Sequence, residues 1–294
     1  MDELVRRNRI QCILALVSCL IVVVCVCIGV TMNLTTIYDE DFDNMGIRTF
    51  CMFTVNSNIL AALSSFAVIP YAIDGLRKKD YALPNWVVIF MMMGTTAVTL
   101  TFLVSLFVLS PVKGFVLIFT GSRFFLHGVC PVLNILAFCV FVTSHKITLK
   151  QSLLSLIPVG IYAIVYFVMV VVIPEESGGW EDFYGFATRI PLWIPVTIVM
   201  PLTFGITTLI RLWHNHSFVS RRKHEAQIFL DHFEGRDAPE IIFEMGNARA
   251  RTQPTGDVIV PTTVIKRIVY FTDSDITLAQ AYQLYLEGYL SAVS

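Results

Sequence analysis

The N-terminal stretch MDELVRRNRIQCILALVSCLIVVVCVCIGVTM, residues 1–32, decides the class of fold. Its three arginines precede a long apolar run, Ile10–Met32. A secretory signal peptide has an apolar core of only about 7–15 residues, followed by a cleavage site of small residues. This run is longer and no such site follows it, so we expect a retained first membrane helix that acts as its own insertion signal.

The composition of the whole chain agrees with that beginning. Apolar residues make up 55% of the 294 residues and charged residues only 15%, with a mean hydropathy of +0.70. A soluble domain has about 25% charged residues. The composition therefore predicts an integral membrane protein, and the net charge of −1 gives no reason to expect a nucleic-acid partner.

Apolar runs of membrane-spanning length recur along the chain. A bilayer core of about 30 Å needs about 20 apolar residues per helix. The runs that meet this length are Ile10–Met32, Thr49–Ile73, Trp86–Leu109, Ser122–Thr143, Ser152–Ile173 and Ile190–Leu212. We therefore expect an all-α membrane protein, a six-transmembrane-helix bundle formed by residues 1–213.

Basic residues predict how the bundle is oriented. They cluster on alternate connections, which places all the clusters on one side if every run spans: Arg6, Arg7 and Arg9; Arg77, Lys78 and Lys79; Lys146 and Lys150; Arg221, Arg222 and Lys223. Cytoplasmic loops carry the excess of lysine and arginine. We therefore expect a multi-pass protein of the cell membrane, with both termini on the cytoplasmic side.

Two of the segments outside the six runs carry a pattern of their own. The apolar stretch Pro111–Gly121 is too short to span, and we expect it to lie in the outer interface or to enter the membrane partway. Residues 214–294 are polar and form a predicted cytoplasmic tail. Val258–Phe271 is typical of a strand, and Thr272–Asp275 offers capping residues for an amphipathic helix over residues 276–290. The tail is thus a small strand-helix appendage or a segment that binds a protein partner.

Polar residues gather near the start of the second run, in FTVNSNIL, residues 53–60. Thr54 and Asn58 are four residues apart and Ser57 is three from Thr54, so the three share one helix face. A lone hydroxyl is tolerated in a membrane because it can bond to its own backbone, whereas amides need partners. This face therefore points into the bundle, where its residues either join helices or form a site.

The fourth run holds an ionisable residue, His127, in RFFLHGVCPVLN, residues 123–134. Arg123 lies one turn before it, Pro131 four residues after it, and Asn134 two turns beyond it. Such a residue inside a span is a functional candidate, because burying it is costly. The structural alternative is a neutral histidine that joins helices by hydrogen bonds.

Depth relates Thr54 to His127. Both runs are directed inward from the outer side, and each residue lies about five positions along its run. At about 1.5 Å per residue both lie about 7 Å below the outer boundary. A hydroxyl becomes a useful nucleophile when a base can take its proton, so this pair has the composition that nucleophilic catalysis needs if the two helices touch.

Three stretches carry a resemblance to a known family: RTFCMFTVNSNIL, FFLHGVCPVLNILAF and GGWEDFYGF, residues 48–60, 124–138 and 178–186. Residues 10–213 resemble the bacterial Pr6Pr-type six-helix membrane proteins, a group similar to the FAR-17a/androgen-induced-gene-1-like family of animals. The animal members are intramembrane threonine hydrolases of fatty acid esters of hydroxy fatty acids.

The resemblance implies that Thr54 is the nucleophile and His127 the base, acting on a lipid or fatty-acid ester from the outer leaflet. The candidates for substrate binding or oxyanion stabilisation are Asn58, Ser57, Arg123 and Asn134. We expect no metal and no cofactor.

The main alternative is a transporter or a small-ligand binding protein, since Pro158 and Pro195 interrupt helices and Asn134, Tyr162 and Tyr166 would line a path. Against it, the sequence shows no internal repeat and no acidic residue within a run. A haem carrier would need paired histidines within spans, and His127 is alone well inside one. A further alternative is a structural or interaction protein whose function resides in the tail.

Overall fold

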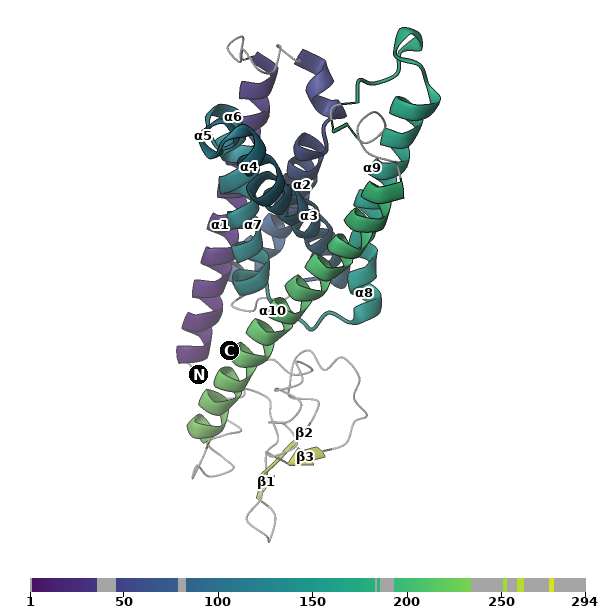
Figure 1. Ribbon diagram of the computed structural model, residues 1–294. Coiled ribbons are helices and arrows are strands. Elements are labelled where there is room, and N and C mark those ends of the chain that lie inside the picture. The colour runs from purple at the N-terminus through teal and green to yellow at the C-terminus, as the bar shows by residue number, and fades with distance from the viewer. Residues whose placement is uncertain are drawn as a thin grey trace.

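The structure, a computed structural model, describes residues 2–35, 46–78, 83–182, 184–185, 193–233, 251–252, 258–261 and 275–277. Its longer helices form a bundle whose axes run from one end of the molecule to the other (Figure 1). The long helices are α1 (Asp2–Thr35), α2 (Phe53–Lys78), α3 (Asn85–Val104), α9 (Ile157–Phe167) and α10 (Trp193–Phe233).

Shorter helical turns extend or connect these helices. The 3-10 turns are η1 (Gly46–Cys51), η5 (Leu154–Leu156) and η7 (Glu175–Ser177). The π turns are η2 (Ser105–Leu109), η3 (Phe124–Val129), η4 (Ala137–Phe141) and η6 (Val168–Val172). The short α-helices are α4 (Ser110–Lys113), α5 (Phe115–Ile118), α6 (Gly121–Arg123), α7 (Cys130–Leu136) and α8 (Leu149–Leu153).

The all-α membrane class is confirmed. Within the described part of the chain, five helical stretches are long and apolar enough to cross a membrane: Arg6–Thr35, Phe53–Arg77, Asn85–Lys113, Gly121–Phe141 and Leu149–Val172. Each overlaps one of the first five expected runs. The sixth expected run, Ile190–Leu212, lies in α10 from Trp193 onward, and its first residues are outside the described part. The start of α1 and the end of α10 lie at the same end of the bundle (Figure 1).

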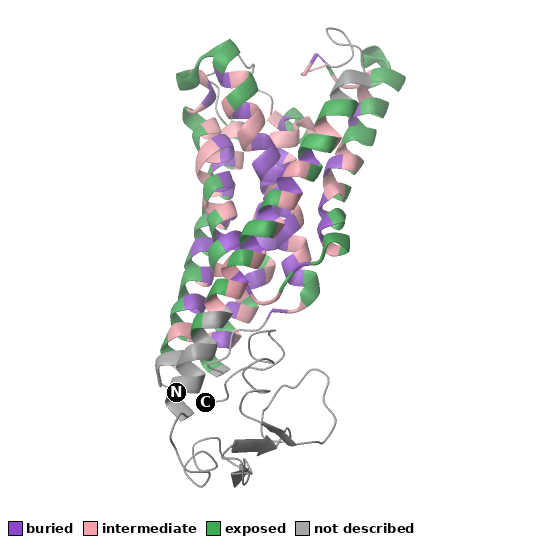
Figure 2. Cartoon of the chain, turned by 60° about the horizontal axis from the view of Figure 1, so that its bottom comes forward, coloured by how far each residue is buried: buried purple, intermediate pink, exposed green. Residues whose placement is uncertain are grey.

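The bundle buries its interior and exposes its periphery. Buried positions line the inward faces of the helices, and exposed ones follow the outward faces (Figure 2). Large apolar side chains such as Phe66, Ile164 and Leu209 are exposed. Since lipid surrounds a membrane protein where water surrounds a soluble one, an apolar exterior is what the class requires.

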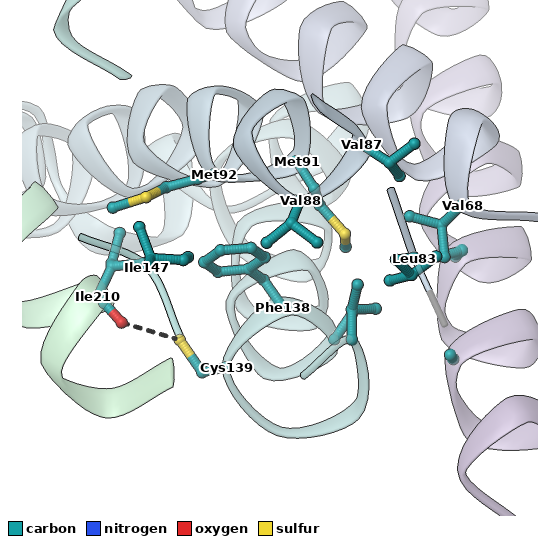
Figure 3. Close-up of a cluster of buried hydrophobic side chains, with 14 of the residues drawn as sticks. Val68, Leu83, Val87, Val88, Met91, Met92, Phe138, Cys139, Ile147 and Ile210 are labelled. Carbon is teal, nitrogen blue, oxygen red and sulfur yellow. Dashed lines mark hydrogen bonds between the residues drawn. The ribbon is translucent and has the colours of Figure 1, made fainter. Parts of the chain in front are cut away.

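The central core forms around α3 and the stretch α7–η4. Phe138 of η4 lies against Met91, Met92 and Val88 of α3, with Ile147 and Ile210 beside it (Figure 3). Helices α2 and α3 approach closely at Gly94. A Cβ there would lie 2.6 Å from Ser64 Oγ and 2.9 Å from the Ala61 Cα, so the contact requires glycine, as is common where membrane helices pack.

Side chains from α1 and α10 hold the connection that follows η4. Gln11 of α1 donates to the carbonyls of Phe141 and Thr143 at 3.0 and 3.3 Å. Asn215 of α10 both accepts from the Ile147 N–H at 2.8 Å and donates to the Ile147 carbonyl at 2.9 Å. Irregular backbone at a bundle end needs such partners, and these fix α10 to the turn between α7 and α8.

In the tail, three short strands form an antiparallel sheet of order β1-β2-β3: β1 (Arg251–Thr252), β2 (Val258–Pro261) and β3 (Asp275–Thr277). The strand β2 falls in the stretch expected to be strand-like. The strand β3 includes Ile276 and Thr277, where the amphipathic helix was expected to begin, so that expectation is wrong for these two residues. The other residues of the expected helix lie outside the described part.

Candidate functional site

Thr54 lies in the first turn of α2 and its hydroxyl is unused by the helix. Six other helical threonines place the hydroxyl within hydrogen-bond distance of the carbonyl four residues earlier: Thr35, Thr95, Thr99, Thr101, Thr203 and Thr208. For Thr54 that carbonyl belongs to Phe50, and it accepts the Asn56 amide at 2.7 Å instead. The half-buried Thr54 hydroxyl has no hydrogen-bond partner among the described residues.

Ser57 and Asn58 are fully engaged donors one turn deeper. The Ser57 hydroxyl lies 2.9 Å from the Thr101 hydroxyl of α3 and 3.0 Å from the Thr54 carbonyl. The Asn58 amide donates to the Thr54 carbonyl at 2.7 Å and to the Leu126 carbonyl at 2.9 Å. Its Oδ1 is buried and has no hydrogen-bond partner. Asn58 thus joins α2 to the turn that carries His127.

The Leu126 carbonyl is available to Asn58 because the helical hydrogen bonding of the fourth span is interrupted there. In the π turn η3 the Cys130 N–H bonds to the Phe125 carbonyl, five residues back, and so bypasses Leu126. The next residue, Pro131, has no N–H to offer. The Leu126 carbonyl therefore lacks both of its helical donors, and the Asn58 amide satisfies it. Single π turns of this kind are frequent at functional sites.

His127 lies in the same π turn, buried, with its ring turned toward the segment that precedes α6. Its Nδ1 lies 3.1 Å from the Ile118 carbonyl, and the Phe119 ring meets it edge-on at a centroid distance of 6.4 Å. A carbonyl oxygen can only accept, so Nδ1 carries the proton. In the neutral ring Nε2 is then the basic nitrogen, and it has no hydrogen-bond partner among the described residues.

The structure brings some predicted residues together and separates others. Helices α2 and η3 touch, as catalysis by Thr54 and His127 would require, through the bond from Asn58 to Leu126. No hydrogen bond joins Thr54 to His127 among the described contacts. Arg123 lies in α6, half-buried, one turn before His127.

Asn134 belongs to a different layer of the bundle. Its amide donates to Ser65 of α2 at 3.2 Å, and its carbonyl accepts from Thr95 of α3 at 2.6 Å. The side chain is fully buried with both ends paired. Asn134 therefore joins three helices, and both ends of its side-chain amide are engaged by protein partners.

A cluster of three tyrosines, Tyr162, Tyr166 and Tyr184, lies at the start of α2. The Tyr184 hydroxyl accepts the Phe53 N–H at 3.0 Å, and the Tyr162 hydroxyl donates to the Cys51 carbonyl at 2.8 Å. Tyr166 donates to Asp182 at 2.5 Å. Burial raises the pKa of Tyr184, so this hydroxyl stays neutral. From the sequence, Tyr162 and Tyr166 were considered only as the lining of a transport path, and the loop Trp180–Tyr184 either as a cap over the site or as an aromatic belt at the membrane interface.

Among the residues that the structure describes, no group of three His, Cys, Asp or Glu side chains is arranged to hold a metal ion. Comparison of the chain with family models, with curated proteins and with solved structures finds no match.

Proposed function

We propose that this chain is a multi-pass membrane hydrolase of lipid or fatty-acid esters, with Thr54 as nucleophile and His127 as base. The observation that carries the proposal is the unused hydroxyl of Thr54, next to the turn whose histidine presents an unpartnered basic nitrogen. The resemblance to the Pr6Pr-type group and its threonine hydrolase relatives supports the same pair, and we propose that the chain belongs to that group.

The chemistry would proceed in two stages. His127 Nε2 takes the proton of the Thr54 hydroxyl as Oγ1 attacks the ester carbonyl, and the leaving alcohol then takes that proton. Water, activated by the same nitrogen, hydrolyses the acyl-threonine to a free acid and restores Thr54. The His127 ring must come within hydrogen-bond range of Oγ1, and catalytic hydrogen bonds of this kind often tighten only when substrate binds.

Four residues were candidates for stabilising the oxyanion that forms during the reaction, and their hydrogen bonds reduce the choice. The donors of Asn58 and Asn134 are committed to protein acceptors, and the Ser57 hydroxyl is held between Thr54 and Thr101. Arg123 differs from these because it is a cation one helical turn from His127. We therefore propose that Arg123 stabilises the negative charge that develops on the substrate oxygen.

Turnover measurements on substituted proteins test this proposal. Purified protein in nanodiscs would be given long-chain esters, among them fatty acid esters of hydroxy fatty acids, and the released acid would be quantified. We expect Thr54→Ala and His127→Ala to lower turnover at least about 10³-fold, in line with loss of a nucleophile or its base. Thr54→Ser should retain measurable turnover because it keeps a hydroxyl.

Thr101→Val is the matched control, since it removes a membrane threonine hydroxyl on the neighbouring helix without touching the pair. Turnover by Thr54→Ala at the rate of the unsubstituted protein would refute the proposal.

A binding or transport function is the second candidate, and one observation favours it. Asn58 Oδ1 is a buried acceptor without a hydrogen-bond partner, at a place where α2, α3 and η3 meet. A buried unpaired acceptor is costly and suits a ligand that donates a hydrogen bond. Solute flux into liposomes without ester cleavage, lost in Asn58→Leu, would favour this candidate over the hydrolase.

A further inference from the structure

The segment from residue 110 to residue 121, called the outer hairpin below, folds back at the end of the third span. The helix of α3 and η2 continues into α4, which ends at Lys113. The chain then reverses at Gly114, whose φ is 94°, forms α5, and turns again at Gly121, whose φ is 57°. A Cβ at either glycine would meet nothing within 4 Å, so the positive φ values, not crowding, require glycine there.

One side of the outer hairpin is apolar and exposed. Val112, Phe115 and Val116 are 81%, 60% and 74% exposed. Exposed apolar side chains also occur on the preceding turn η2, where Phe107 and Val108 are 69% and 57% exposed. A patch of this kind on a folded chain marks an interaction surface. Since it continues the side of a membrane-spanning helix, its partner is lipid rather than a second protein.

The other side of the outer hairpin closes on His127. Ile118 is 1% exposed, and its carbonyl accepts the hydrogen bond from His127 Nδ1 at 3.1 Å. The Phe119 ring meets the imidazole at an angle of 82°, and its centroid lies 4.7 Å from that of the tilted Phe115 ring. A Cβ at Gly128, one residue after His127, would lie 3.5 Å from the Phe119 ring. In Figure 1 α4, α5 and α6 lie together beside α1 and α7, at the end of the bundle opposite the start of α1.

We propose that the outer hairpin is a lid immersed in the acyl chains of the outer leaflet and fastened to the bundle by the hydrogen bond from His127 to Ile118. Val112, Phe115 and Val116 dissolve in lipid, while the carbonyl of Ile118 holds the lid over the imidazole. Release of that bond frees the ring and opens a lateral route from the leaflet to His127. The fastening rests on the contact between His127 and Ile118, and the immersion on the exposed apolar side chains. The assignment to the outer leaflet rests on the predicted orientation of the chain, and the role of the route in ester hydrolysis rests on the proposed function.

Lipid quenching tests the immersion. Val116→Trp would be placed in nanodiscs whose lipids carry bromine on the acyl chains, and the fluorescence of the unsubstituted protein subtracted. We expect strong quenching, at least half of the added signal, relative to unbrominated lipid. Glu176→Trp, in the exposed turn η7, is the control and should be little quenched. Equal, weak quenching at both positions would overturn the immersion.

Hydrogen exchange tests the fastening without reference to any enzymatic activity. In His127→Ala the amides of residues 115–119 should exchange at least tenfold faster than in the unsubstituted protein. Asn134→Ala removes a buried polar side chain of the same span and should leave this segment unchanged. Slow exchange in α3 verifies that each variant is folded. Unaltered exchange of residues 115–119 in folded His127→Ala would overturn the fastening, whatever the outcome of the turnover measurements.

Discussion

Thr54 and Thr101 show how two membrane threonines can differ in what the hydroxyl does. The Thr101 hydroxyl joins α3 to Ser57 of α2, whereas the Thr54 hydroxyl joins nothing that the structure describes. A residue with a structural role stabilises the fold, and a residue kept for chemistry does not need to. The two threonines, one in α2 and one in α3, therefore offer a direct comparison of a hydroxyl that joins helices with one that does not.

Isosteric substitution turns that difference into a prediction. Thr101→Val loses a buried interhelical hydrogen bond, and such bonds in membrane proteins contribute about 0.6 kcal/mol on average and up to about 1.7. We expect its Tm to fall by a few degrees, because about 1 kcal/mol corresponds to roughly 2–4 °C for a domain of about 200 residues. Thr54→Val should leave the Tm within about 1 °C of the unsubstituted protein. Thermal unfolding in detergent measures both, and an equal loss in the two variants would indicate that Thr54 is structural.

For single residues, the sequence allowed us to name candidate site residues, but it did not predict most of the contacts that their side chains make. Equal depth predicted that Thr54 and His127 could meet, and periodicity placed Thr54, Ser57 and Asn58 on one face. It could not foresee that the ring of His127 turns toward Ile118, because that carbonyl belongs to a hairpin with no periodic signal. Asn134 was grouped with the site, and the sequence did not show that its amide bonds to side chains on two other helices.

At the scale of elements, the π turn η3 is the feature that joins α2 to the fourth span. Pro131 was visible in the sequence as a helix breaker. The effect of Pro131 on the hydrogen bonding could not be predicted, because it depends on the Cys130 N–H donating to the Phe125 carbonyl instead of the Leu126 carbonyl. A single hydrogen bond between residues five apart does not change the pattern of apolar residues. The sequence therefore does not show which carbonyl accepts the Asn58 amide, and the structure does.

A double-mutant cycle tests this account of η3. Asn58→Ala alone leaves the Leu126 carbonyl without a donor and should cost about 1–2 kcal/mol of unfolding free energy. Pro131→Ala supplies the missing N–H five residues after Leu126. In the Pro131→Ala background the cost of Asn58→Ala should therefore shrink by about 0.5–1 kcal/mol. Strictly additive costs would show that Pro131 is not the reason for the contact.

On the scale of the whole molecule, composition and run length sufficed for the class and for the first five spans. Boundaries moved by a few residues: the second helix begins at Phe53 because Thr49 falls in the 3-10 turn η1, and the third stretch continues to Lys113. The connection between η4 and α8 is held by polar side chains of α1 and α10, which no apolar pattern predicts. The same holds for His214, whose ring lies between the carbonyls of Phe138 and His145.

The arrangement of basic residues predicts that both termini face the cytoplasm and that the chain crosses the membrane six times. Reporter fusions check this. A fluorescent protein that matures only in the cytoplasm should be bright on the C-terminus. A periplasm-dependent phosphatase should be active when fused after Glu176 and inactive when fused after Lys150. Activity of the phosphatase after Lys150 would contradict the predicted orientation.

The central claim is that the Thr54 hydroxyl is a nucleophile activated by His127, and covalent labelling addresses it most directly. Protein in nanodiscs would be treated with a long-chain alkyl fluorophosphonate, which loses fluoride to an activated hydroxyl, and the adduct would be located by peptide mass spectrometry. We predict a single adduct on Thr54 that disappears in His127→Ala and persists in Thr101→Val. An unlabelled Thr54 in the unsubstituted protein, or labelling that is unaffected by His127→Ala, would contradict the account.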